Sequence, residues 1–178
     1  MLKKDSQRIV DELQTAHATE IAGYFFYKAA AEMIDDKKGR NVFEHLAGEE
    51  LDHIKVIAAI AKSLKGGGKW LAYDEAVKKG KGEGAPIFPE TNELIKRLKA
   101  NETDLNAIEI GIESEEKAVE FYSRLLDRAE TPDEKVALTN ILEMEKAHLK
   151  ILRWESESLN QNGFWCGQME YSVEKEAE

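Results

Sequence analysis

The sequence predicts an all-α protein: a four-helix bundle built from two repeated helical hairpins that a long connection joins. Apolar residues recur at steps of three and four in four long segments, which is the period of an α-helix. The chain also repeats itself at a constant offset of 95 residues, so that Glu50-Leu51-Asp52-His53 aligns with Glu145-Lys146-Ala147-His148. None of the three prolines falls in the interior of a long segment, as a helical prediction requires.

The first hairpin is predicted from residue 6 to residue 64. Its first helix runs from about Ser6 to Ile34, and the polar stretch 35–39 interrupts the periodic pattern. The second helix follows from about residue 41 to 64, where a run of three glycines ends it. Because the turn between them is short, we expect these two helices to pack as antiparallel neighbours.

Residues 66–102 are predicted to form the long crossover between the hairpins. Six of the twelve glycines and two of the three prolines lie within residues 66–90, which is typical of an irregular connection. Short helices are expected at 73–79 and 91–100. Such a connection allows the second hairpin to dock in register with the first.

The second hairpin is predicted from residue 103 to about 158. Its first helix covers about 103–129, and the sequence Thr131-Pro132-Asp133-Glu134 then forms a capping box. In that box Thr131 is the N-cap, Pro132 is the first helical residue, and Glu134 is the third. The fourth helix is expected to end near Ser158.

We therefore predict a bundle domain at 1–158 and a C-terminal tail at 159–178. Four of the aromatic and apolar side chains of the tail lie among polar residues, which favours packing onto the bundle or onto a partner subunit over a disordered tail, except at the last few residues. These residues are Phe164, Trp165, Met169 and Tyr171.

Each of the four predicted helices carries a glutamate on its apolar stripe, where an aliphatic core residue is expected. Carboxylates are rarely buried unless they are paired or bind a metal. Two of these glutamates have a histidine three residues later, on the same face of the helix and within reach of the same ion. The four glutamates are Glu20, Glu50, Glu115 and Glu145, and the two histidines are His53 and His148.

This set predicts a site for two divalent cations, whose charge would balance the four carboxylates. The order Glu, Glu-x-x-His, Glu, Glu-x-x-His is the ligand pattern of di-iron and di-manganese carboxylate bundles. Carboxylate and imidazole ligands suit iron or manganese, including a mixed pair, and zinc is chemically possible. Glu20 and Glu115 are the candidates for capping or bridging ligands, and the spacing does not decide which of them bridges the two ions. His17 lies three residues before Glu20, and we interpret it as a core or boundary histidine rather than a further ligand.

Composition excludes several classes of partner. The formal net charge of −10 argues against nucleic acid and against an anionic membrane surface. No stretch reaches the apolar length of a transmembrane helix, and the first residues lack the apolar region of a secretory signal. A single cysteine, Cys166, allows no intramolecular disulfide, so the cytoplasm is the expected compartment.

The motif set Glu20…Tyr27, Glu50-x-x-His53, Glu115…Tyr122 and Glu145-x-x-His148 resembles the rubrerythrin branch of the ferritin-like superfamily. The resemblance covers residues 5–157 and implies a ferritin-like bundle with two iron ions on the two Glu-x-x-His motifs and the two lone glutamates. It also implies that Tyr27 and Tyr122 hydrogen-bond ligand carboxylates. From the residues alone, plain core packing is the alternative for these tyrosines.

Two departures from that family affect the expected reaction. Rubrerythrins carry a rubredoxin-like FeS₄ domain that needs four cysteines, and this sequence has one. They also carry a further carboxylate three residues after the third-helix ligand, where this chain has Ala118. We therefore expect a simpler six-ligand site that receives electrons from a separate protein such as a rubredoxin.

The expected activity is reduction of hydrogen peroxide, or of dioxygen, in defence against oxidative stress. The alternative is iron handling, as a ferroxidase or an iron-binding or storage protein. The glycine-rich crossover resembles rubrerythrins more than cage ferritins, and a homodimer is the expected assembly. A dimer argues against storage, whereas a large cage argues for it.

Overall fold

The computed structural model describes residues 4–82, 84 and 86–167, and these residues form helices without a strand. This confirms the all-α prediction. Six helices follow one another along this part of the chain: α1 (Lys4–Met33), α2 (Lys37–Lys65), α3 (Tyr73–Gly80), α4 (Glu93–Ala100), α5 (Asp104–Asp127) and α6 (Pro132–Asn162).

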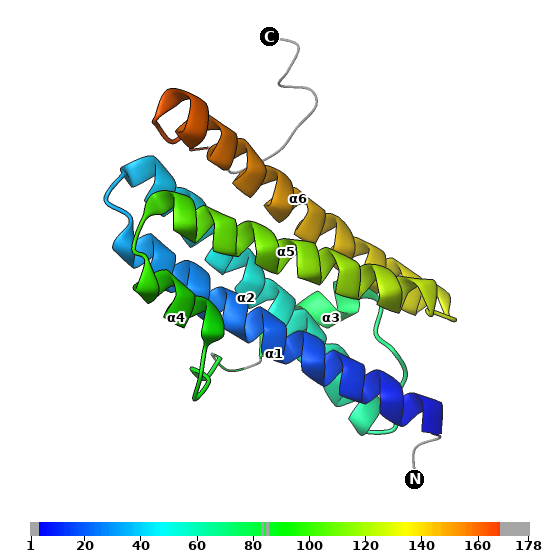
Figure 1. Ribbon diagram of the computed structural model, residues 1–178. Coiled ribbons are helices and arrows are strands. Elements are labelled where there is room, and N and C mark those ends of the chain that lie inside the picture. The colour runs from blue at the N-terminus through cyan, green and yellow to red at the C-terminus, as the bar shows by residue number, and fades with distance from the viewer. Residues whose placement is uncertain (1–3, 83, 85, 168–178) are drawn as a thin grey trace, which may run out of the picture.

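The four long helices form a bundle of two antiparallel hairpins, α1 with α2 and α5 with α6 (Figure 1). The two short helices belong to the crossover that joins them. Helix α3 contacts α2 and α6, whereas α4 contacts α1 and α5, so the crossover supports both hairpins. None of the described helices combines the length and the apolar character that a membrane span requires.

Equivalent caps start the second helix of each hairpin. The Asp36 carboxylate accepts hydrogen bonds from the backbone N–H groups of Lys38 and Gly39, at 2.7 and 3.1 Å. Because of this cap, α2 begins at residue 37, four residues earlier than predicted. Thr131 caps α6 in the predicted capping box with Glu134. Asp36 and Thr131 are 95 residues apart, so the repeat extends to the caps.

Helix α6 is longer than the sequence predicted. It continues to Asn162 rather than to residue 158, so the predicted start of the tail at 159 falls inside the helix. Leu159 packs against the core and extends the apolar stripe by one turn. Gly163 then ends the helix with a φ of 74°, a left-handed conformation that glycine adopts without steric cost.

The described part of the tail lies on the bundle, one of the two arrangements expected. Trp165 is 2% exposed, packs edge-on against Phe43, and donates a hydrogen bond from its indole nitrogen to Asp104 at 2.8 Å. A side chain at Gly39 would collide with this ring, because an added Cβ would lie 2.4 Å from it. Two other tail residues singled out above lie outside the described residues: Met169 and Tyr171.

Two apolar clusters fill the bundle, one toward each end. One includes Phe26 and Phe43, near the turn between α1 and α2, and the other includes Leu13 and Leu138. On all four long helices, the Glu and His positions singled out above fall between the segments that contribute to the two clusters. The polar residues therefore lie mid-bundle, with an apolar cluster on either side along each helix.

Candidate metal centre

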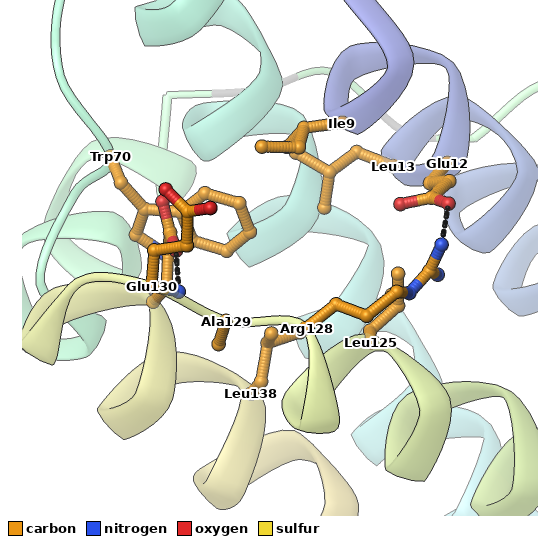
Figure 2. A pocket seen from close by; sticks show the side chains of 10 residues that line it. Ile9, Glu12, Leu13, Trp70, Leu125, Arg128, Ala129, Glu130 and Leu138 are labelled. Atoms are coloured by element: carbon orange, nitrogen blue, oxygen red, sulfur yellow. Dashed lines mark hydrogen bonds and ion pairs between the residues drawn. The ribbon is translucent and has the colours of Figure 1, made fainter. Parts of the chain in front are cut away.

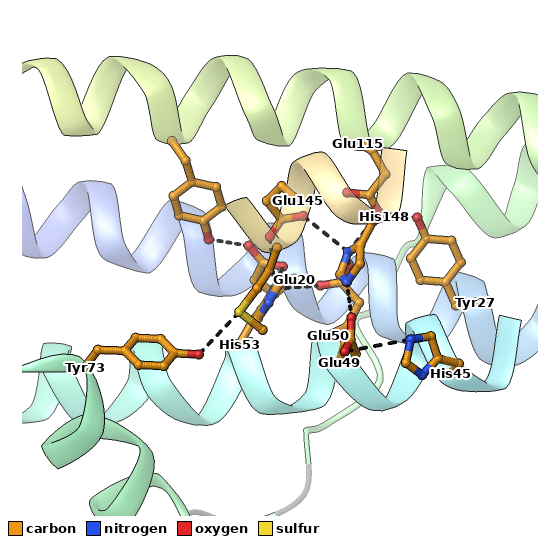
Figure 3. A network of polar contacts seen from close by, with 12 residues as sticks. Glu20, Tyr27, His45, Glu49, Glu50, His53, Tyr73, Glu115, Glu145 and His148 are labelled. Atoms are coloured by element: carbon orange, nitrogen blue, oxygen red, sulfur yellow. Dashed lines mark hydrogen bonds and ion pairs between the residues drawn. The ribbon is translucent and has the colours of Figure 1, made fainter. Parts of the chain in front are cut away.

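All six predicted ligands are buried in the middle of the bundle and point toward one another (Figure 3). Each of the four long helices contributes to the cluster, and none of these side chains is more than 3% exposed. The contributors are Glu20 from α1, Glu50 and His53 from α2, Glu115 from α5, and Glu145 and His148 from α6.

The six side chains form two overlapping groups of four, and within each group the candidate ligand atoms lie within 4.8 Å of one another. The first group is Glu20, Glu50, His53 and Glu145, and the second is Glu50, Glu115, Glu145 and His148. Because Glu50 and Glu145 belong to both groups, these two carboxylates would be shared by two bound ions, whereas the sequence had suggested Glu20 or Glu115. Glu20 and Glu115 would each serve one ion.

The unsatisfied atoms of the cluster fit a cation. Buried polar atoms nearly always have hydrogen-bond partners, yet several oxygens and ring nitrogens here have none in the described part of the chain. The Nδ1 atom of His53, for example, lies 2.9 Å from a Glu145 oxygen without hydrogen-bond geometry. These atoms are Glu50 Oε2, both ring nitrogens of His53, Glu115 Oε2, both Glu145 oxygens and His148 Nδ1. A divalent cation would satisfy most of them at once.

The four carboxyl groups divide into two pairs by pKa. Burial, together with the nearby Glu145 charge, raises the pKa of Glu115 to about 8 and that of Glu20 well above its usual value. Burial also opposes ionisation of Glu50, but its contacts with the Glu20 carboxyl group and the two imidazoles outweigh it and lower the Glu50 pKa to about 2. The charge on His53 similarly lowers the pKa of Glu145. The two shared carboxylates are therefore the ionised pair.

The surroundings of the two imidazoles favour their protonated forms in the metal-free protein. Burial alone would lower the pKa of both, but contacts with the surrounding carboxylates raise the pKa of His53 and of His148 well above the usual value. The strongest opposing effects are the charge of Glu145 on His53 and the close approach of the Glu115 carboxyl group to His148. Protons thus balance the charge of the cluster, and a bound metal would have to displace them.

The two tyrosines that were expected to bond ligand carboxylates each donate a hydrogen bond to a carboxyl group of the opposite hairpin. Tyr27 on α1 donates to Glu115 on α5, and Tyr122 on α5 donates to Glu20 on α1. Seven residues along a helix span about 10 Å, so neither tyrosine reaches the glutamate of its own helix. Burial and the adjacent carboxylates raise the pKa of both phenols, which keeps the hydroxyl groups neutral donors.

Glu49 contacts the cluster although its position in the sequence did not predict it. Its Oε2 atom lies 2.8 Å from Nε2 of His148, and its Oε1 atom lies 3.8 Å from His45 (Figure 3). This bond with His148 lowers the pKa of Glu49. The repeat could not reveal Glu49, because the position 95 residues further on is Met144.

Other sequence candidates lie outside the two groups. His17 lines a surface pocket between α1 and α2, with Leu13 and Lys62 among its neighbours, which agrees with its interpretation as a boundary residue. Ala118, where the resemblance places a further carboxylate, is buried beside Glu20 and Tyr122.

A separate pocket lies among the N-terminal half of α1, the α5–α6 turn and Trp70 of the crossover (Figure 2). Its volume is about 110 Å³, and an ion pair of 2.6 Å joins Glu12 and Arg128 at its wall. None of the six predicted ligands lines this pocket. It is therefore distinct from the candidate metal centre.

Comparisons with curated proteins and with solved structures found no match. A family model described as Rubrerythrin matches residues 11–155. This span contains both Glu-x-x-His motifs, both lone glutamates and both tyrosines. The chain therefore belongs to the rubrerythrin family, a family of ferritin-like di-iron proteins.

Proposed function

We propose that this protein is a dinuclear-metal oxidoreductase that reduces hydrogen peroxide or dioxygen with electrons from an external protein donor. Two iron ions are the proposed cofactor, held by Glu20, Glu50, His53, Glu115, Glu145 and His148. The observation that supports the proposal is the pair of overlapping ligand groups buried in the middle of the bundle. Membership of the rubrerythrin family supports iron as the metal.

The residues of the site have distinct roles in this proposal. When bound, a pair of ferrous ions would supply the two electrons needed to cleave an O–O bond and convert peroxide, with two protons, into two water molecules. Tyr27 and Tyr122 hold the outer carboxylates Glu115 and Glu20 in place through their hydroxyl hydrogen bonds. The apolar clusters on both sides exclude bulk water from the site.

A surface pocket beside Glu20 offers a small oxidant an access route to the metal centre. A pocket of about 250 Å³ between α1 and α5 is lined by Glu20, Tyr122 and Ala118, so a wall of the metal centre faces the surface there. The alanine leaves this wall without a further carboxylate. The pocket is large enough to admit peroxide or dioxygen.

We place the electron donor outside these 178 residues. A rubredoxin-type centre needs four cysteines, and this sequence contains Cys166 alone. A rubredoxin or another small redox protein would therefore dock on the surface to reduce the oxidised site.

A homodimer is the proposed assembly. Ile87 and Phe88 of the crossover are 84% and 53% exposed, and Phe88 packs edge-on against Phe25 of α1. Large apolar side chains exposed together are typical of an interaction surface. Analytical ultracentrifugation would separate a dimer from the large cage that iron storage needs.

The decisive experiment measures metal content per chain and then the oxidation of the ferrous protein by peroxide and by oxygen in separate stopped-flow runs. We expect about two iron ions per chain, as in di-iron bundles, and faster oxidation by peroxide. Oxygen as the faster oxidant would support the ferroxidase alternative. No bound metal after reconstitution would contradict the proposal. His17→Ala, which alters a histidine outside both groups, is the matched control and should keep full metal content.

A further inference from the structure

We propose that Glu49 makes the two metal positions unequal, so that the ion at the His148 position is held more tightly than the ion at the His53 position. Glu49 is a positioning residue in this inference, since it acts on the metal through His148. The inference rests on the two-metal site of the proposed function. It concerns the order and strength of metal binding rather than the reaction.

The two ring nitrogens of His148 face different groups. Its Nδ1 atom faces the ligand cluster, 3.6 Å from Glu50 and from Glu145 and 3.7 Å from Glu115. Its Nε2 atom points the other way and lies 2.8 Å from the Glu49 carboxylate. The hydrogen bond therefore orients the ring with Nδ1 directed at the metal position.

His53 has no such support. Its Nδ1 atom also faces the cluster, 3.6 Å from Glu20 and 2.9 Å from Glu145. Its Nε2 atom is buried and has no hydrogen-bond partner among the described residues. The two imidazoles, whose rings stack at 5.4 Å between centroids, thus present the same nitrogen to the site but differ at the other.

The repeat shows where the missing partner would be. Tyr27 and Tyr122 each bond a glutamate of the opposite hairpin, and Glu49 on α2 likewise bonds His148 on α6. By the same exchange, the partner of His53 would stand on α6, 95 residues after Glu49. That residue is Met144, whose sulfur lies 3.3 Å from the Tyr73 hydroxyl. A thioether in place of a carboxylate breaks the symmetry at this position.

This difference has a direct effect on ligand strength. A carboxylate that accepts the second ring N–H of a metal-bound imidazole fixes the orientation of the ring and makes the other nitrogen a stronger donor. Removing such a partner typically weakens metal binding about 10–100-fold. Glu49 also adds a negative charge close to one metal position. Both effects favour the ion at His148.

The test is an anaerobic titration of the metal-free protein with Co²⁺. Calorimetry and competition with a chromophoric chelator measure the affinity of each binding step. The unaltered protein should bind two ions in separate steps. Glu49→Ala should weaken the tight step about 10–100-fold and leave the weak step unchanged. Glu20→Ala, which alters only the group that contains His53, should retain the tight step and so assigns the steps to the two positions.

The reciprocal variant restores the missing partner. Met144→Glu should strengthen the weak step and leave the tight one, with Met144→Gln as the control of equal size and no charge. Met144→Glu also tests the inference if Glu49→Ala fails to fold. Circular dichroism of the metal-free variant would reveal such a failure.

Three results are distinguishable. Equal weakening of both steps by Glu49→Ala, or no change in either, would overturn the inference while leaving the two-metal site intact. Two bound cobalt ions with the expected asymmetry, in a protein whose iron form reacts with neither oxidant, would overturn the proposed reaction alone. Absence of Co²⁺ binding would overturn both.

Discussion

The two hairpins of this protein are alike in the residues predicted to bind the ions and differ in the residues that contact those ligands. At an offset of 95 residues, each predicted ligand of the first hairpin has a counterpart in the second, and Tyr27 has its counterpart in Tyr122. The N-caps Asp36 and Thr131 also correspond. In contrast, Glu49 corresponds to Met144. Among the described residues, a carboxylate therefore bonds Nε2 of His148 but none bonds Nε2 of His53. A duplicated ligand set therefore does not imply two equivalent metal positions.

Small residues flank the lone glutamate of each hairpin, but their contacts differ. Ala16 and Gly23 flank Glu20 on α1, and Gly111 and Ala118 flank Glu115 on α5, at the same spacing. An added Cβ at Gly23 would lie 3.6 Å from Glu50, which is ordinary contact, whereas one at Gly111 would lie 3.0 Å from Leu152. Gly111 thus lets α5 approach Leu152 of α6 closely, whereas the space at Gly23 would accept a methyl group beside Glu50.

The largest expected effect separates shared from unshared ligands. Glu145→Ala should remove a ligand from both groups and reduce metal content from about two ions per chain to well below one. Glu115→Ala should affect one group and leave about one ion. Metal analysis after gel filtration measures both. Equal losses in the two variants would contradict the assignment of Glu145 as a bridge.

The pH dependence of stability should reverse when metal binds. The pKa of Glu115 is about 8 in the folded protein against 4.5 ordinarily, so the folded state binds the extra proton. Stability from this group is therefore complete below pH 4.5 and is lost as the pH rises through 8. The raised pKa values of Glu20, His53 and His148 act in the same direction.

Melting temperatures of the metal-free protein should consequently fall as the pH rises across that window. Over the same pH range, the difference in melting temperature between the metal-loaded and the metal-free protein should increase, because metal binding requires deprotonated ligands. A ligand present at a thousandfold its dissociation constant adds about 4 kcal/mol, or about 8–16 °C for a chain of this size. Glu115→Gln should flatten the metal-free profile, and an unchanged slope would contradict the assignment.

Removing the hydroxyl group of Tyr27 or of Tyr122 should lower the free energy of unfolding by similar amounts. Tyr27→Phe and Tyr122→Phe each leave a buried carboxyl oxygen without its donor, so each should cost about 1–3 kcal/mol in the free energy of unfolding. Urea denaturation of the metal-free variants measures this. Tyr73→Phe, which removes a half-buried hydroxyl bonded only to the Met144 sulfur, should cost less. Strongly unequal effects of Tyr27→Phe and Tyr122→Phe would show that the asymmetry extends beyond Glu49.

The smallest expected effect concerns the helix caps. Asp36→Ala and Thr131→Ala should each destabilise the protein by about 1 kcal/mol, since each removes acceptors for backbone N–H groups at a helix start. Thermal unfolding of the chelator-treated proteins measures both changes. A loss of metal content in either variant would show that the caps also position the ligands.

By itself the sequence determined the parts of this protein that depend on spacing along one helix. Steps of three and four place Glu50 and His53 on one buried face, and the same holds for Glu145 and His148. The capping box at Thr131 is likewise local, because its partners are within four residues. The offset of 95 residues then paired the helices into two hairpins. These features need no knowledge of how the hairpins dock.

Only the tertiary structure decided which side chains meet across the bundle. The sharing of Glu50 and Glu145 between two groups, the exchange of tyrosine partners and the bond from Glu49 to His148 all join different hairpins. No local pattern encodes such contacts, because they depend on the distance and rotation of one hairpin relative to the other. Glu49 is half-exposed and lies beside the apolar stripe, so its spacing alone is that of a solvated surface residue. Docking of α6 against α2 brings it to His148.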